Sequence, residues 1–169
     1  MSQGGRDVDP ALLVDHLQRL SLAEGNGWHV STVQAIAGLT PRGPVAALPG
    51  WPCIWELAAH IRYWVARMTV VLEALYRGGA PPPRSGTDWP QVPDAPDPAA
   101  WACLQAELAR ALEGLPGVVS TLKPVHLLTP SAGMGSPSAL YEIHGLLAHT
   151  SDHTGQILLL RRLRCVWPQ

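Results

Sequence analysis

Apolar residues recur at helical spacing along most of the chain, and segments rich in proline and glycine separate these runs. The first run follows Asp9-Pro10, a pair that predicts a helix start with Asp9 as the N-cap. Its leucines fall on one face of a helix: Leu12, Leu13, Leu17, Leu20 and Leu22. Residues 28–39 continue the pattern, and they predict either a second helix or a kinked continuation of the first.

Three longer runs predict the main helices of the fold. Pro52 is expected in the first turn of a helix that ends at Gly78-Gly79. Asp97-Pro98 starts an amphipathic helix over residues 99–115, with Trp101, Leu104, Leu108 and Leu112 in its apolar stripe. Ser136-Pro137 caps a last helix that reaches about residue 164. Residues 118–136 leave open a short strand or extended chain.

Residues 78–98 hold seven prolines and three glycines, a composition that excludes regular structure. The pieces on either side are too small to form separate cores. We therefore expect one domain over residues 1–169, with this segment crossing its surface over a site and Trp89 as its anchor. Helices without strands predict an all-α, up-and-down four-helix bundle with a long Pro-rich connection between its second and third helices.

Composition narrows the class of protein. Hydrophobic residues make up 47% and charged residues 15%, which is typical of a globular domain, and the net charge of −1 argues against a nucleic-acid partner. No apolar run has the length of a signal peptide or a membrane span. The cysteines are odd in number and far apart, which favours a reducing compartment: Cys53, Cys103 and Cys165. We expect a cytoplasmic protein with no membrane partner.

Histidines in two of the long helices carry the candidate chemistry. His149 and His153 lie four residues apart, so their side chains point within about 40° of each other on a helix. His60 lies beside the apolar stripe of the other helix, where a single histidine is more often bonded to a backbone carbonyl. Together the three predict a three-nitrogen metal site between facing helices. The other histidines fit such a site less well: His16, His29, His126 and His144.

Three polar residues share faces with these histidines. Glu142 and Gln156 lie seven residues on either side of His149, and each is a candidate second-shell group that orients an imidazole, or else a solvated or capping residue. Glu56 lies one turn before His60, where a first-turn acid interacts favourably with the helix dipole. Glu142 and Glu56 are also the candidates for a catalytic base.

The segments WHVSTVQAIAGLTP, WELAAHIRYW and AHTSDHTGQI together resemble the DinB-like proteins, also called the DinB/YfiT-like metalloenzymes. The resemblance covers about residues 28–163. It implies a four-helix bundle in which one histidine of the second helix and two of the fourth hold a metal. These positions fall on His60, His149 and His153.

The same resemblance implies several functional features. Some members resemble thiol S-transferases that use a low-molecular-weight bacterial thiol, and a related branch isomerises maleylpyruvate with mycothiol. The family is associated with DNA damage or stress response in some bacteria, and its members often form homodimers. Gly155-Gln156-Ile157 matches the family pattern, whereas Thr154 stands where many members carry Arg.

Two functions remain after these considerations. The first is a stress-related, metal-dependent enzyme, a thiol S-transferase or a hydrolase of a small-molecule substrate, with Zn²⁺ or Ni²⁺ at the three histidines and a low-molecular-weight thiol as a further cofactor. The alternative is a non-catalytic bundle protein that binds a metal or a small molecule. A fourth protein ligand that closes the metal site would favour the alternative.

Overall fold

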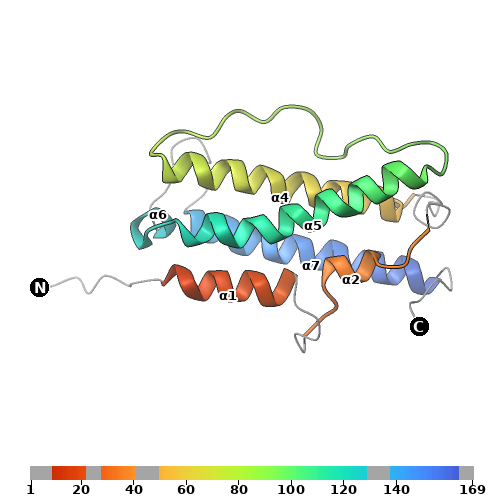
Figure 1. Ribbon diagram of the computed structural model, residues 1–169, viewed down its shortest axis with the longest axis horizontal. Helices are drawn as coiled ribbons and strands as arrows, with labels where there is room; N and C mark the ends of the chain where they lie inside the picture. The colour runs from red at the N-terminus through yellow and green to blue at the C-terminus, as the bar shows by residue number, and fades with distance from the viewer. Residues whose placement is uncertain (1–8, 22–27, 41–49, 129–137, 164–169) are drawn as a thin grey trace, which may run out of the picture.

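The computed structural model describes residues 9–21, 28–40, 50–128 and 138–163. All regular structure in these ranges is helical (Figure 1). The helices are α1 (Pro10–Ser21), α2 (Thr32–Ile36), α4 (Ile54–Tyr76), α5 (Pro98–Ser120), α6 (Pro124–Leu128) and α7 (Ala139–Leu163). Within the described ranges, no helix is long and apolar enough to cross a membrane.

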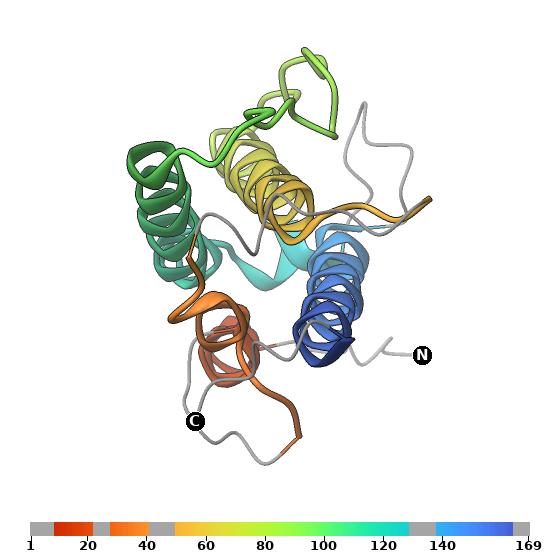
Figure 2. The ribbon, with the colours of Figure 1, turned by 90° about the vertical axis from the view of Figure 1, so that its right-hand side faces the viewer.

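Four of these helices form the bundle that the sequence predicts. Viewed along the bundle, α1, α5, α4 and α7 follow one another around a shared core (Figure 2). Helix α4 packs against α5 and α7, and α1 packs against the same two helices from the opposite corner. The prediction of an all-α four-helix bundle is therefore confirmed.

Helices α4 and α5 run in the same direction, so the order of the bundle departs from the expected up-and-down arrangement at this pair of helices. Their first turns meet where the rings of Trp55 and Trp101 lie 5.2 Å apart, and further along Arg62 approaches Glu107 at 3.7 Å. Residues 77–97 make this possible, because they cross back along the bundle from the end of α4 to the start of α5 (Figure 1). Proline keeps such a segment extended, so it covers the length of α4 without forming a helix of its own.

Both predicted Asp-Pro helix starts are present. The Asp9 carboxylate accepts a hydrogen bond from the Ala11 amide at 2.9 Å. The Asp97 carboxylate accepts from the amides of Ala99 and Ala100 at 3.0 Å. In both cases the proline follows the cap, where its missing N–H costs no helical hydrogen bond.

Several predicted helix bounds were wrong. Helix α4 begins at Ile54 after the N-cap Cys53, so Pro52 lies before the helix. Helix α2 covers only Thr32–Ile36 of the run at residues 28–39. Helix α5 continues through Pro116 to Ser120, because two residues after the expected end, Pro116 and Val119, still pack into the core.

The ambiguous segment at residues 118–136 is mostly helical where it is described, apart from a turn at residues 121–123. Its first residues belong to α5, and α6 follows at Pro124–Leu128. The predicted cap at Ser136-Pro137, the helix end near residue 164 and Cys165 lie outside the described residues.

One buried polar centre, which we call the Arg161 centre, joins α2 to α7. The Arg161 side chain is only 2% exposed, and its Nη1 atom donates to the carbonyl oxygens of Ala35 and Ala37 at 2.5 and 2.9 Å. Beside it, the hydroxyls of Thr32 and Thr154 lie 2.7 Å apart. Since buried polar groups are stable only when hydrogen-bonded, these contacts explain how a short helix holds its place against α7.

Candidate metal centre

Three histidines from two helices meet inside the bundle. His60 of α4 is 4% exposed, and His149 and His153 of α7 are partly buried. The Nε2 atom of His149 lies 3.0 Å from Nε2 of His60 and 3.1 Å from Nε2 of His153. Each ring therefore presents the same nitrogen to one point between α4 and α7. Among the described residues, this is the group of three side chains that could hold a metal ion.

The Pro-rich segment orients His60. Its Nδ1 atom lies 2.5 Å from the Asp88 carbonyl oxygen, which can only accept a hydrogen bond. Nδ1 therefore carries the proton, and Nε2 presents its lone pair to the cluster. The Trp89 ring stacks on the His60 imidazole, with 4.0 Å between the ring centroids and 17° between the ring planes. The segment therefore crosses over the histidine cluster, and Trp89 contacts it there.

A second hydrogen-bonded chain orients His153. Its Nδ1 atom lies 3.1 Å from Oε1 of Gln156, and Nε2 of Gln156 donates to the Asp152 carboxylate at 2.9 Å. Because the carboxylate fixes which end of the amide is the donor, Gln156 offers its oxygen to His153. Nδ1 of His153 is therefore the donor, and its Nε2 lone pair also points into the cluster.

His149 lies between the other two rings and has no orienting partner. Its Nδ1 atom is buried and makes no hydrogen bond within the described part of the chain. Burial, together with the neighbouring His153 and His60, lowers the pKa of His149 to about 4. Burial also lowers the pKa of His60. Both rings are held neutral at physiological pH, which is the form that binds a metal.

The donor set fits a divalent transition metal. An ion that holds nitrogens at about 2.0–2.1 Å separates them by about 2.8–3.0 Å in octahedral geometry and about 3.3–3.4 Å in tetrahedral geometry. The observed nitrogen separations of 3.0 and 3.1 Å lie between the octahedral and tetrahedral values. Without a cation, two lone pairs face His149 Nε2, which has at most one proton to donate. A metal would satisfy all three nitrogens at once, and imidazole ligands suit zinc, nickel, copper and iron.

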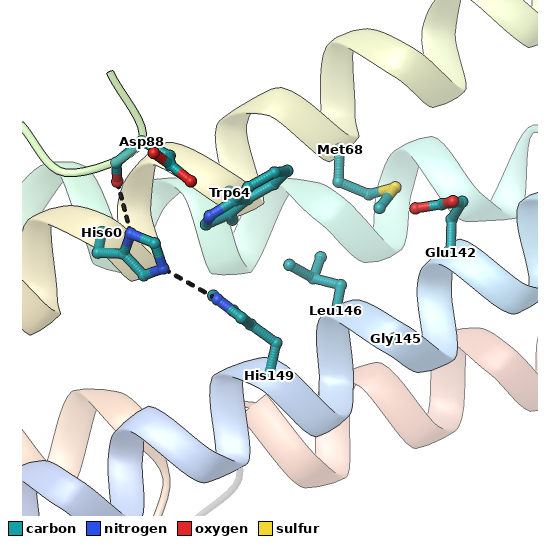
Figure 3. Close-up of a pocket in the computed structure, with 8 residues that line it drawn as sticks. All are labelled: His60, Trp64, Met68, Asp88, Glu142, Gly145, Leu146 and His149. Atoms are coloured by element: carbon teal, nitrogen blue, oxygen red, sulfur yellow. Dashed lines mark hydrogen bonds between the residues drawn. The ribbon is translucent and has the colours of Figure 1, made fainter. Parts of the chain in front are cut away.

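A cavity of about 280 Å³ opens beside the cluster (Figure 3). Its walls come from α4, α7 and the Pro-rich segment: His60, Trp64, Met68, Asp88, Glu142, Gly145, Leu146 and His149. The Trp64 indole nitrogen is buried without a hydrogen-bond partner in the described structure, and Figure 3 shows it on the side that faces His60 and His149. A donor in this position is free to bind an oxygen of a molecule in the cavity.

The acidic candidates lie apart from the three nitrogens. Glu142 lines the cavity at the end away from His60, beside Met68 (Figure 3). The Glu56 carboxylate accepts a hydrogen bond from the Cys53 amide at 2.6 Å and forms a capping box at the start of α4. Glu56 therefore has the helix-start role that its position in the first turn favours.

Sequence reasoning missed two contributors to the site. Asp88 acts through its backbone carbonyl, so its side-chain type gives no signal of the contact with His60. Trp64 could have been found, because it follows His60 by one helical turn and so shares its face. Outside the cluster, Nδ1 of His29 donates to the Val30 carbonyl at 2.9 Å, and Nδ1 of His126 accepts from the Lys123 amide at 3.2 Å.

Comparison with known families agrees with this architecture. The model of the DinB superfamily matches residues 9–157, a range that includes all three histidines. No significant match was found among the curated proteins or among the solved structures. Because the match covers most of the sequence, the chain belongs to the DinB superfamily.

Proposed function

We propose that this protein is a metal-dependent enzyme whose cofactor is held by His60, His149 and His153. The observation that carries the proposal is the convergence of three Nε2 atoms, with the tautomers of two rings fixed by hydrogen bonds to their Nδ1 atoms. Within the described residues the group has three members and no fourth protein ligand. A three-ligand site keeps a position for an exchangeable molecule, which favours catalysis over simple metal storage.

The chain's own residues suit a reaction with a small, partly apolar molecule. A bound Zn²⁺ or Ni²⁺ would polarise the substrate or lower the pKa of a thiol or water toward neutrality. Met68 and Leu146 line the cavity with apolar surface, which suits an apolar part of the substrate. The Trp64 N–H faces the histidines and is available to hold a substrate oxygen.

The position of Glu142 favours thiol transfer over hydrolysis. Glu142 and His149 are separated by seven residues on α7, or about 10 Å along the helix axis, which is too far for direct proton transfer at the histidines. Hydrolysis by a water molecule that is not bound to the metal needs a base close to that water. A thiol that is already deprotonated needs none, because the thiolate is itself the nucleophile. The proposed reaction is therefore the attack of a low-molecular-weight thiolate on an electrophile bound in the cavity: a C–S bond forms, the leaving group (halide, for an aryl halide) departs with its electron pair, and the thiol proton passes to solvent.

Elemental analysis of the purified protein and a metal-dependent thiol-transfer assay test this proposal. We expect about one metal ion per chain, with Zn²⁺- or Ni²⁺-dependent conjugation of a small thiol to an aryl halide. His60→Ala should lose both the metal and the activity. The matched control is His144→Ala, which removes an exposed histidine from α7 outside the cluster. Equal metal content in wild type and His60→Ala would refute the site, and a loaded but inactive protein would favour the binding alternative.

A further inference from the structure

A second cavity continues the first one outward along α4. It has a volume of about 460 Å³, and its walls are Trp64, Arg67, Met68, Val71, Pro81, Pro82, Pro83, Arg84 and Glu142. Trp64, Met68 and Glu142 line both cavities. The two spaces therefore form one trough, with an inner section at the histidines and an outer section under the prolines.

The two arginines of the outer section differ in their contacts. Arg84 is already held, because its Nη2 atom lies 3.3 Å from the Asp88 carboxylate and its guanidinium lies 4.7 Å from the centre of the Trp64 ring. This cation–π contact makes Arg84 a wall of the trough. Arg67 and Glu142 face the same space, but neither forms an ion pair or side-chain hydrogen bond with any described residue, including each other.

Unpaired opposite charges across one cavity limit what can bind between them. Arg67 can only donate hydrogen bonds, and an ionised Glu142 can only accept them. An anion alone would be placed beside the Glu142 carboxylate, and a cation alone beside two guanidinium groups. A group with both charges satisfies both walls. We propose that the outer section binds the zwitterionic α-amino acid end of a ligand, with its carboxylate at Arg67 and its ammonium at Glu142.

The spacing along the helices sets the length of this ligand. Arg67 follows His60 by seven residues on α4, and Glu142 precedes His149 by seven on α7. Each interval corresponds to about 10 Å along a helix axis. The ligand therefore carries its reactive group and its amino acid end about 10 Å apart, with a spacer that passes Met68. This inference rests on the proposed function only for the reactive group at the histidines.

Isothermal titration with glutathione as the probe tests the subsite, because its γ-glutamyl group ends in a free α-amino acid at a distance from the thiol. The zinc-loaded protein is titrated with glutathione, with its N-acetyl derivative and with its γ-glutamyl α-carboxamide. We expect each derivative to bind about tenfold more weakly than glutathione, because each lacks one charge-assisted hydrogen bond to the subsite.

Two variants assign the contacts separately. Arg67→Gln should remove the difference between glutathione and the carboxamide while keeping the preference for the free ammonium. Glu142→Gln should remove the difference between glutathione and the N-acetyl derivative while keeping the preference for the carboxylate. Arg110→Gln, which neutralises an exposed arginine on α5, is the matched control and should keep both preferences.

The metal-free protein separates this inference from the proposed function. S-methylglutathione and its two derivatives lack a free thiol, so we expect the same two preferences with them at lower affinity. Retained preferences without any gain in affinity from zinc would count against the metal-dependent function and support the subsite. Equal binding of all derivatives by wild type, no binding of any, or identical losses in both variants would overturn the subsite.

Discussion

The bundle contains two buried polar centres, and they differ in how their hydrogen bonds are completed. Arg161 is satisfied from within the chain, since its guanidinium donates to the backbone carbonyls at the end of α2. The histidine cluster is incomplete, because lone pairs face one another and His149 Nδ1 has no partner among the described residues. A buried centre whose polar groups are all hydrogen-bonded within the chain stabilises the fold. A buried centre with unsatisfied polar groups can bind a ligand that satisfies them.

The largest effect expected from this difference is metal-linked stability. A metal that binds the folded chain at a free concentration 1,000 times its dissociation constant stabilises it by about 4 kcal/mol. His149→Ala should abolish this gain, since it removes the nitrogen shared by both close contacts. The measurement is urea unfolding with and without zinc, with His144→Ala as the control. An undiminished gain in His149→Ala would mean that zinc binds elsewhere.

A substitution in the Arg161 centre should lower the stability of the fold and leave zinc binding unchanged. Arg161→Met leaves the carbonyls of Ala35 and Ala37 buried without their donor, at a cost of about 3 kcal/mol in the free energy of unfolding. Its zinc stoichiometry should stay that of the wild type, because the cluster uses other residues. A loss of metal without a loss of stability in this variant would contradict the division between the two centres.

The sequence carries different amounts of information about the two centres. The spacing of His149 and His153 places both on one helical face, and the apolar neighbours of His60 place it toward the core, so the cluster could be proposed from residue pattern alone. Arg161 was not singled out, although it follows the buried Ile157 by one turn and so shares its face. A charged residue next to a second arginine gives no indication of which of the two points inward.

Features that depend on the path of the chain could not be predicted. The Asp88 carbonyl reaches His60 only because residues 77–97 cross back along the bundle, and the same path makes α4 and α5 parallel. Neither follows from the composition of the loop, which indicates only that it is extended. The continuation of α5 through Pro116 was missed for a related reason, since burial of the following turn outweighs the local cost of a proline.

A smaller effect should separate the oriented ring of His153 from the unoriented ring of His149. Gln156→Met removes the oxygen that accepts from His153 Nδ1, and loss of such an orienting partner typically weakens metal binding about 10- to 100-fold. Gln156→Glu retains an acceptor at the same place and should restore most of the affinity. Competition with a chromogenic zinc chelator measures both variants. Equal affinity in wild type and Gln156→Met would remove this residue from the site.

The smallest effect concerns the proton affinity of the cluster without metal. The pKa of His149 is about 4 in the folded chain against an ordinary value of 6.5, so between these values the unfolded chain binds more protons. The stability of the metal-free protein should therefore be constant above about pH 6.5 and fall as the pH decreases toward 4. The fall is smaller than the shift alone implies, because the ring is only partly buried and solvent screens it. Unfolding in the presence of a chelator at pH 7 and pH 5 measures this dependence. His149→Ala is the control, because the contribution of carboxylate titration to the loss of stability is the same in the variant and the wild type. The variant should therefore lose less stability between the two conditions, whereas equal losses would show that burial of this ring does not control its protonation.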